Sequence, residues 1–332
     1  MIISKTPFRI SLFGGGTDYP SWYRQNGGSV LAAAIDKYCH ISCRHLPPFF
    51  DHKHRIVYSK VESVKTIEEI QHPSVRAVLS TLGISAGLEI HHDGDLPARS
   101  GIGSSSSFTV GLINVVNALK GQQTSKEDLA KQAIFIEQEV LKESVGSQDQ
   151  ILAAFGGFNR IDFNPDDSFN IAPVIINKDL MNQLQDHMLI FFTGLSRFSS
   201  DIAKDKINNF TSRFRELTQI KEIVDEAMSI LQSTSVPIEN LGKLLHESWK
   251  LKRSLSAKIS TPYIDEIYEA GISAGAIGGK ILGAGGGGFI LFFAKPENHK
   301  NIRLRLKDLV HVSFRFDNMG SKIVVYEPNG FK

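Results

Sequence analysis

The stretch Leu96-Pro97-Ala98-Arg99-Ser100-Gly101-Ile102-Gly103-Ser104-Ser105-Ser106-Ser107 joins a glycine-rich turn to four serines. The apolar residues over 108–119 recur at largely helical spacing, so a serine-capped helix is expected to begin here. A helix N-terminus presents unpaired N–H groups and a positive dipole end, which together attract anions. The stretch therefore predicts a phosphate cradle. An ordinary serine-capped helix after a glycine turn is the alternative, and no Gly-Lys-Ser/Thr sequence makes it a Walker motif.

The composition is that of a globular chain with one large domain or two ordinary ones. It has 332 residues, 42% of them hydrophobic, and 37 basic against 35 acidic residues give a net charge of +2. This balance lacks the basic surface expected of a nucleic-acid-binding protein. No apolar run has the length of a membrane span, and the N-terminus does not read as a secretory signal. Because Cys39 and Cys43 cannot build a disulfide framework, we expect a reduced, cytoplasmic protein without nucleic-acid or membrane partners.

Apolar periodicity and turn residues predict the remaining elements. Strands are expected over 2–13, 28–45, 54–61, 87–93, 188–192, 289–293 and 322–327. Helices are expected over 66–82, 125–142, 200–232, 237–258 and 297–309.

Two other sequence patterns are candidates for binding sites, one for zinc and one for a dinucleotide, and neither is favoured. Cys39, His40 and Cys43 have no zinc-ligand spacing, and in a strand His40 would point away from the two cysteines. The segment Gly283-Ala284-Gly285-Gly286-Gly287-Gly288 matches the dinucleotide fingerprint letter for letter. It precedes an apolar strand, however, whereas the fingerprint must follow a strand and open a helix, so a Rossmann site is rejected.

Three motifs taken together resemble the GHMP kinases, a family of small-molecule kinases acting on galactose, homoserine, mevalonate and phosphomevalonate. They run from Pro7 to Tyr19, from Pro97 to Ser107 and from Lys280 to Gly288, and the second matches the family pattern Pro-x-x-x-Gly-x-Gly-Ser-Ser. The resemblance covers essentially the whole chain. It implies an α+β fold of two lobes, residues 1–180 like ribosomal protein S5 domain 2 and residues 181–332 ferredoxin-like, with the site between them.

Shorter segments are similar to one branch of this family, the D-glycero-D-manno-heptose 7-phosphate kinases. The segments cover 14–18, 146–150 and 192–197. This resemblance implies ATP-dependent phosphorylation of the anomeric hydroxyl to give the 1,7-bisphosphate, in nucleotide-activated heptose biosynthesis. Galactokinases carry Gly-Glu-His-Thr-Asp where this chain has Gly14-Gly15-Gly16-Thr17-Asp18, which argues against plain galactose. A kinase for another sugar (galactose or fucose type) or a mevalonate-type substrate, and a non-catalytic nucleotide-binding regulator, are the alternatives.

The resemblance also implies catalytic roles. Asp149 is the candidate base, and Arg9 lies where the galactokinase branch has an arginine beside that aspartate. Mg²⁺ is expected between Ser105 and Glu137, with Glu139 as the competing carboxylate.

Binding roles follow in the same way. The implied ATP-binding residues are Pro97, Arg99, Ser100, Gly101, Ile102, Gly103, Ser104, Ser105, Ser106 and Ser107. Support for this loop is expected from Lys280, Gly283, Gly285 and Gly286. The sugar phosphate is expected to contact Gly15, Gly16, Thr17, Asp18, Thr193, Gly194, Ser196 and Arg197.

The phosphate group that such a sugar already carries needs a cationic side chain to bind it. Arg197 follows an apolar strand in a Gly/Ser loop, and its guanidinium suits two phosphate oxygens. The alternatives are that Arg197 is an ordinary surface residue and that the phosphate pocket lies along Lys250, Lys252 and Arg253.

Overall fold

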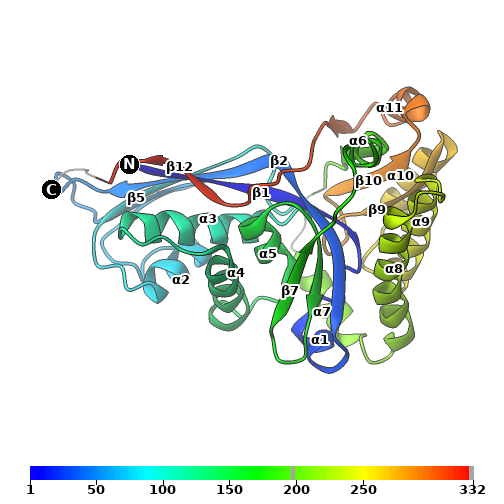
Figure 1. The fold of residues 1–332 in the computed structure, drawn as a ribbon. Helices are drawn as coiled ribbons and strands as arrows, with labels where there is room; N and C mark the ends of the chain where they lie inside the picture. The colour runs from blue at the N-terminus through cyan, green and yellow to red at the C-terminus, as the bar shows by residue number, and fades with distance from the viewer. Residues whose placement is uncertain (196–198, 329–332) are drawn as a thin grey trace.

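The computed structural model describes residues 1–195 and 199–328, so the predicted contacts Ser196 and Arg197 lie outside the described residues. Two β-sheets organise the chain, and helices cover one face of each (Figure 1). This is the two-lobed α+β architecture predicted from the sequence.

The larger sheet has eight strands. Its main path runs β12 (Lys322–Tyr326), β1 (Ile2–Phe13), β2 (Gly28–His45), β5 (Leu88–Gly94), β3 (His54–Val57) and β4 (Val61–Val64). The long strand β2 pairs with β5 through its second half and with β6 (Phe158–Phe163) through its first, and β6 then pairs with β7 (Phe169–Pro173). Because β2 is shared in this way, the β1–β2 ribbon connects the two ends of the lobe.

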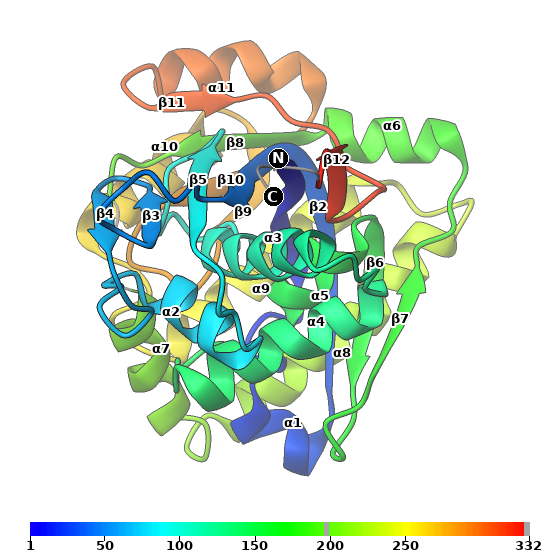
Figure 2. The ribbon, with the colours of Figure 1, turned by 90° about the vertical axis from the view of Figure 1, so that its left-hand side faces the viewer.

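A helical layer covers one face of this sheet. It contains α2 (Pro73–Thr81), α3 (Ser104–Leu119), α4 (Lys126–Phe135) and α5 (Gln148–Phe155) (Figures 1 and 2). Helix α3 packs on β1 and β2 and is covered in turn by α4 and α5, which explains why nearly every residue from Ser106 to Ala118 is buried. The predicted apolar helix is thus the centre of the lobe, and its N-terminus lies at the site.

The smaller sheet has the order β11 (Val310–Val312), β8 (Met188–Phe192), β10 (Phe289–Ala294), β9 (Ala276–Ile281), all antiparallel. Numbered within this sheet the order is 4-1-3-2, and helices join the first strand to the second and the third to the fourth. This is the ferredoxin-like arrangement that was predicted. Its helices include α8 (Phe214–Gln232), α9 (Glu239–Ser254), α10 (Pro262–Ser273) and α11 (His299–Arg305).

Helix α8 packs against α9 and also against β1 and β2, so it links the two sheets. Helix α1 (Pro20–Asn26) follows the first glycine motif, and α7 (Ser199–Asn208) precedes α8 near it (Figure 1). Helix α6 (Lys178–Asp186) spans the predicted boundary at 180/181, and β12 returns to the larger sheet. The division of the chain into two domains at that boundary stays a prediction.

In the described part of the chain, no helix is long and apolar enough to cross a membrane.

Several predicted elements are divided or shortened. The helix expected over 200–232 is interrupted at 209–213, because asparagines favour turns and Asn209 Nδ2 donates to Leu255 O at 3.0 Å. The strand expected over 54–61 forms the hairpin strands β3 and β4. The helix expected over 66–82 begins only at Pro73, capped by His72. The helix expected over 125–142 ends in a π-helical turn, η1 (Ile136–Val140).

Candidate active site

The predicted phosphate cradle is the turn into α3. Gly103 is the N-cap, in the left-handed conformation with φ 75°, and no described side chain caps the helix. The expected serine cap is therefore wrong. The backbone bond from Ser107 N to Gly103 O opens the helix, which leaves the first-turn N–H groups of Ser104, Ser105 and Ser106 for a ligand. An uncapped N-terminus of this kind binds an anion better than the capped one predicted.

The residues before the cradle are held by local bonds. Ser100 is fully buried and its hydroxyl donates to Pro97 O at 2.5 Å. Arg99 has a positive φ of 59°, and its N–H donates to Ser104 Oγ at 3.2 Å. Ile102 is buried and its carbonyl accepts Arg9 N at 3.0 Å, so the turn is attached to β1.

The glycine-rich loop after β9 supports this turn from the other lobe. A Cβ on Gly101 would lie 2.6 Å from Leu282 O, and one on Gly283 would lie 2.5 Å from Gly101 Cα. Phe289 N also donates to Ser100 O at 3.1 Å. The two loops therefore touch through their backbones, which only glycine allows at these positions.

Buried lysines and further glycines hold that supporting loop. Lys280 Nζ donates to Leu12 O at 2.9 Å, and Lys252 Nζ donates to Ile281 O and Gly283 O at 2.7 Å each. Gly286 N donates to Ile259 O at 2.9 Å, and Gly285 packs against Ile259.

The alternative phosphate pocket was expected along Lys250, Lys252 and Arg253. Lys250 forms an ion pair with Glu247, and Arg253 forms one with Asp265. The alternative phosphate pocket along these three cations thus consists of side chains that already have protein partners.

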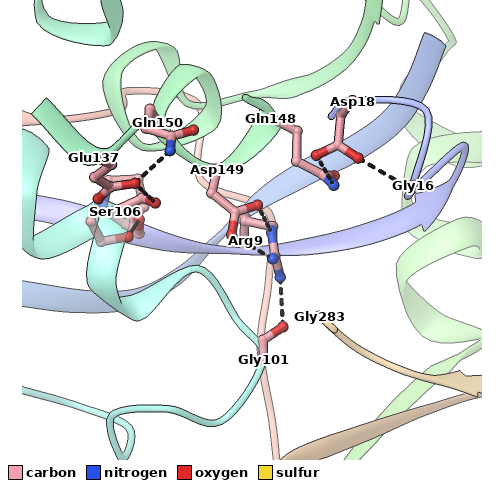
Figure 3. Close-up of polar contacts among 12 residues, drawn as sticks. Arg9, Gly16, Asp18, Gly101, Ser106, Glu137, Gln148, Asp149, Gln150 and Gly283 are labelled. Carbon is pink, nitrogen blue, oxygen red and sulfur yellow. Dashed lines mark hydrogen bonds and ion pairs between the residues drawn. The ribbon is translucent and has the colours of Figure 1, made fainter. Parts of the chain in front are cut away.

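Arg9 connects the candidate base to the cradle (Figure 3). Its Nε and Nη2 atoms each lie 2.7 Å from an oxygen of Asp149, and Nη1 donates to Gly101 O at 2.6 Å. The Arg9 side chain is 5% exposed and that of Asp149 24%. Asp149 lies in the first turn of α5, near the positive end of that helix. The predicted catalytic pair is therefore brought together beside the phosphate cradle.

Asp18 occupies the neighbouring position (Figure 3). Its carboxylate accepts Gly16 N at 2.8 Å and Gln148 Nε2 at 2.9 Å, and its carbonyl accepts Ser147 N. A Cβ on Gly146 would lie 1.9 Å from Asp18 Oδ2, so this glycine admits the buried carboxylate. The first glycine motif thus meets the segment 146–149, as expected of a shared site.

The other described residues that were predicted to contact the acceptor sugar include Thr17 and Thr193, whose hydroxyls bond to backbone carbonyls. Thr17 Oγ1 donates to Gly14 O and Ser29 O at 2.9 Å, and Gly15 lies beside Ser11. Thr193 N and Oγ1 both bind Gly288 O, at 2.8 and 2.9 Å. Gly194 has a φ of 77°, and no atom of the described residues beyond its chain neighbours lies within 4 Å of where its Cβ would be.

The predicted metal ligands are arranged differently from expectation. Glu137 lies in η1, and its Oε2 accepts Ser106 Oγ at 2.8 Å and also Gln150 Nε2 (Figure 3). Its Oε1 is buried and has no hydrogen-bond partner among the described residues. Burial raises the pKa of Glu137 to about 7. Ser105, the predicted magnesium ligand, is exposed, and the serine hydroxyl that bonds directly to Glu137 is that of Ser106. Glu139 is exposed and pairs with Lys142. Within 1–195 and 199–328, no three His, Cys, Asp or Glu side chains cluster in a metal-binding group.

Three residues near the site were missed as site residues: Tyr19, Gln148 and Lys206. Gln148 lies in the segment 146–150 that resembles the heptose kinases, and Tyr19 is the last residue of the motif that begins at Pro7, so both were within stretches already recognised. Lys206 is 4% exposed on α7, with Nζ 4.1 Å from the centroid of the Tyr19 ring. Burial lowers the pKa of Lys206 to about 8, and the charges of Asp18 and Asp149 oppose that shift. No local sequence signal separates this lysine from others on the charged faces of helices.

Comparisons with known proteins agree with this geometry. The family models described as GHMP kinases N terminal domain and GHMP kinases C terminal match residues 67–157 and 237–311, together half of the chain. A D-glycero-alpha-D-manno-heptose 7-phosphate kinase of Campylobacter jejuni is 29% identical over 97% of this chain and 98% of its own length. The bifunctional fucokinase/GDP-fucose pyrophosphorylase of Arabidopsis thaliana is 26% identical over 93% of this chain but 31% of its own length.

A solved structure extends the comparison to the fold. The crystal structure of a D-glycero-D-manno-heptose 1-phosphate kinase from Bacteroides thetaiotaomicron has a TM-score of 0.79, covering 98% of this chain and 100% of the other. The two sequences are 22% identical, so this likeness shows a shared fold.

Proposed function

We propose that this chain, which belongs to the GHMP kinase family, transfers the γ-phosphoryl group of ATP to the anomeric hydroxyl of D-glycero-D-manno-heptose 7-phosphate. The product is the 1,7-bisphosphate. The observation that carries the chemistry is the continuous link from Asp149 through Arg9 to Gly101, which couples a base to a phosphate cradle. The near full-length similarity to the Campylobacter jejuni heptose 7-phosphate kinase supports the choice of acceptor.

Asp149 is positioned to act as the base. As the bond between the anomeric oxygen and phosphorus forms, the bond from phosphorus to the bridging oxygen of ADP breaks, and Asp149 accepts the hydroxyl proton. Each oxygen of Asp149 already accepts one bond from Arg9 but keeps a further lone pair for the sugar hydroxyl. Arg9 thus orients the base, and its positive charge offsets charge on the transferring group.

The cradle and the acceptor pocket divide the positioning between them. The N–H groups of Ser104, Ser105 and Ser106 at the uncapped start of α3 suit the phosphates of ATP. Asp18, fixed by Gln148 and the backbone, suits the ring hydroxyls of the acceptor. This arrangement, with Asp149 between the two, supports a kinase over a non-catalytic nucleotide-binding regulator.

Mg²⁺ fits beside the cradle, because Glu137 is a buried carboxylate whose Oε1 has no hydrogen-bond partner among the described residues, and a serine hydroxyl lies at its other oxygen. Glu137 would hold the ion together with Ser106 or the predicted Ser105, and phosphate oxygens and water would complete its shell. When bound, Mg²⁺ neutralises phosphate charge. We place the reaction in the cytoplasm, which the two buried free thiols Cys39 and Cys43 support.

A coupled assay for ADP release tests the function. The acceptors are D-glycero-D-manno-heptose 7-phosphate, the same heptose without phosphate, galactose, fucose and mevalonate. We expect the highest kcat/KM with the heptose 7-phosphate. A higher value with fucose, galactose or mevalonate would overturn the proposed acceptor, and no acceptor-dependent ADP release with any of them would support the regulator.

A further inference from the structure

Lys206 is a buried cation on the acceptor side of the site. It projects from α7, its ammonium lies over the Tyr19 ring, and Asp18 and Asp149 are close enough to stabilise its charge. Phe210, in the turn just after α7, packs edge-on against the same ring at 5.9 Å. Lys206 and Phe210 therefore both contact Tyr19, and Lys206 lies next to the residue that follows Asp18.

The partners of Lys206 distinguish it from the two other buried lysines of the site. Lys252 and Lys280 donate to backbone carbonyls at 2.7–2.9 Å. No hydrogen bond or ion pair joins the Lys206 ammonium to any described residue, and the Tyr19 ring is its one polarisable neighbour there. Burying an ammonium without acceptors is unfavourable, and a cation–π contact compensates only part of that cost. No side chain described in the structure occupies the three donors of Lys206, and a ligand with acceptor oxygens would satisfy them.

The charge balance of the site indicates the kind of ligand. Arg9, Lys206, Lys252 and Lys280 are all buried. Burial lowers the pKa of Lys252, and the positive charges of Lys280, Lys206 and Arg9 lower it further. The charge of Asp18 opposes the lowering on all three lysines, and that of Asp149 opposes it on Lys206. Basic side chains gathered at a buried site favour an anionic ligand, and an ammonium suits a phosphate monoester as a compact point charge.

We propose that Lys206 binds the phosphate group that the acceptor sugar already carries, and so makes the enzyme selective for phosphorylated acceptors. This inference rests on the proposed function and adds a specificity residue to it. It differs from the sequence-based assignment of the same role to Arg197. Lys206 contacts Tyr19, the residue after Asp18, so a sugar held by Asp18 would lie on the same side of the site as its ammonium.

Two acceptors that differ only in this phosphate test the proposal. In Lys206→Met, which keeps most of the apolar stem, KM for heptose 7-phosphate should rise about 10- to 100-fold, the loss expected for one charge-assisted contact. The kcat value and the KM for ATP should change little, and kcat/KM for the unphosphorylated heptose should stay near wild type. Lys206→Arg should recover part of the loss because it keeps the charge.

Matched controls separate binding from folding. Lys204→Met removes an exposed lysine from the same helix and should leave both acceptors unaffected. Calorimetric binding of heptose 7-phosphate without ATP should weaken in Lys206→Met by the same factor as KM. Lys206→Gln serves as the test variant if Lys206→Met does not fold.

The outcomes for Lys206 and for the proposed function are distinct. Equal losses on both acceptors, or unchanged binding of heptose 7-phosphate, would overturn the role of Lys206 while leaving the kinase assignment intact. A wild-type enzyme that prefers the unphosphorylated heptose would instead overturn the proposed acceptor and this inference together.

Discussion

The proposed nucleotide side of the site is built from backbone, and the proposed acceptor side from side chains. On the nucleotide side, Gly101 and Gly283 bring two loops from different lobes into direct contact, and Phe289 N bonds to Ser100 O. On the proposed acceptor side, Asp18 and Tyr19 are neighbours in the turn that leads into α1 and Lys206 comes from α7, and Lys206 has no hydrogen-bonding partner among the described residues. With the proposed roles, the difference teaches that phosphate binding would be a property of the fold, whereas acceptor choice would depend on single side chains.

The largest effect should come from the residue between the two sides. Asp149→Asn keeps the size of the side chain but removes proton acceptance, and kcat should fall about 100-fold or more. The KM for ATP should change little, because Asp149 does not form the cradle. Steady-state kinetics with nucleotide binding as a control measure both quantities, and turnover near the wild-type value would remove Asp149 from the role of base.

A substitution in the supporting loop should weaken ATP binding by displacing the backbone of the cradle. Gly283→Ala places a methyl group 2.5 Å from Gly101 Cα, so the cradle must shift and KM for ATP should rise about tenfold. Gly83→Ala is the matched control, because Gly83 has a similar φ of 63° and nothing within 4 Å of its Cβ position. Both variants carry the cost of a left-handed alanine, so only the difference between them reports the loop contact. Equal KM values for ATP in the two variants would show that the close approach is not needed.

Substitutions of the proposed metal ligands should show which of two neighbouring serines, Ser105 or Ser106, contributes to Mg²⁺ binding. Glu137→Gln should raise the Mg²⁺ concentration for half-maximal activity about tenfold, and Ser106→Ala should raise it more than Ser105→Ala, because only Ser106 contacts Glu137. Titration of Mg²⁺ at saturating ATP measures this order. A larger shift for Ser105→Ala would restore the sequence-based pair, and no shift for Glu137→Gln would remove that carboxylate from the metal site.

The smallest effect should come from Thr193, which the sequence places at the acceptor. Its hydroxyl bonds to Gly288 O, so Thr193→Val should lower the free energy of unfolding by about 1 kcal/mol. The KM for the acceptor should stay within about threefold of wild type. Denaturant unfolding and acceptor kinetics test these values, and a tenfold rise in KM would make Thr193 a substrate contact.

The sequence was informative where the structure depends on glycine and on helix periodicity. The glycines of the Gly101–Ser107 turn and of the supporting loop at 283–288 were visible as motifs, since close backbone approach demands glycine. The pair of Arg9 and Asp149 was predicted from the family resemblance alone, because the two residues are 140 positions apart. The break of the long helix at 209–213 and the contact of Ser106 with Glu137 depend on tertiary packing and on the π-helical turn. Lys206 was missed for a related reason: a lysine in a charged helix looks the same whether it is buried or exposed.

The position and number of phosphates on the product test the central claim most directly. After reaction of heptose 7-phosphate with ATP, ³¹P NMR of the isolated sugar should show two phosphate signals of equal intensity, the new one coupled to the anomeric proton. This result would establish transfer to the hydroxyl expected beside Asp149. A new phosphate coupled to any other sugar proton, or a sugar that retains one phosphate while ADP forms, would contradict the account.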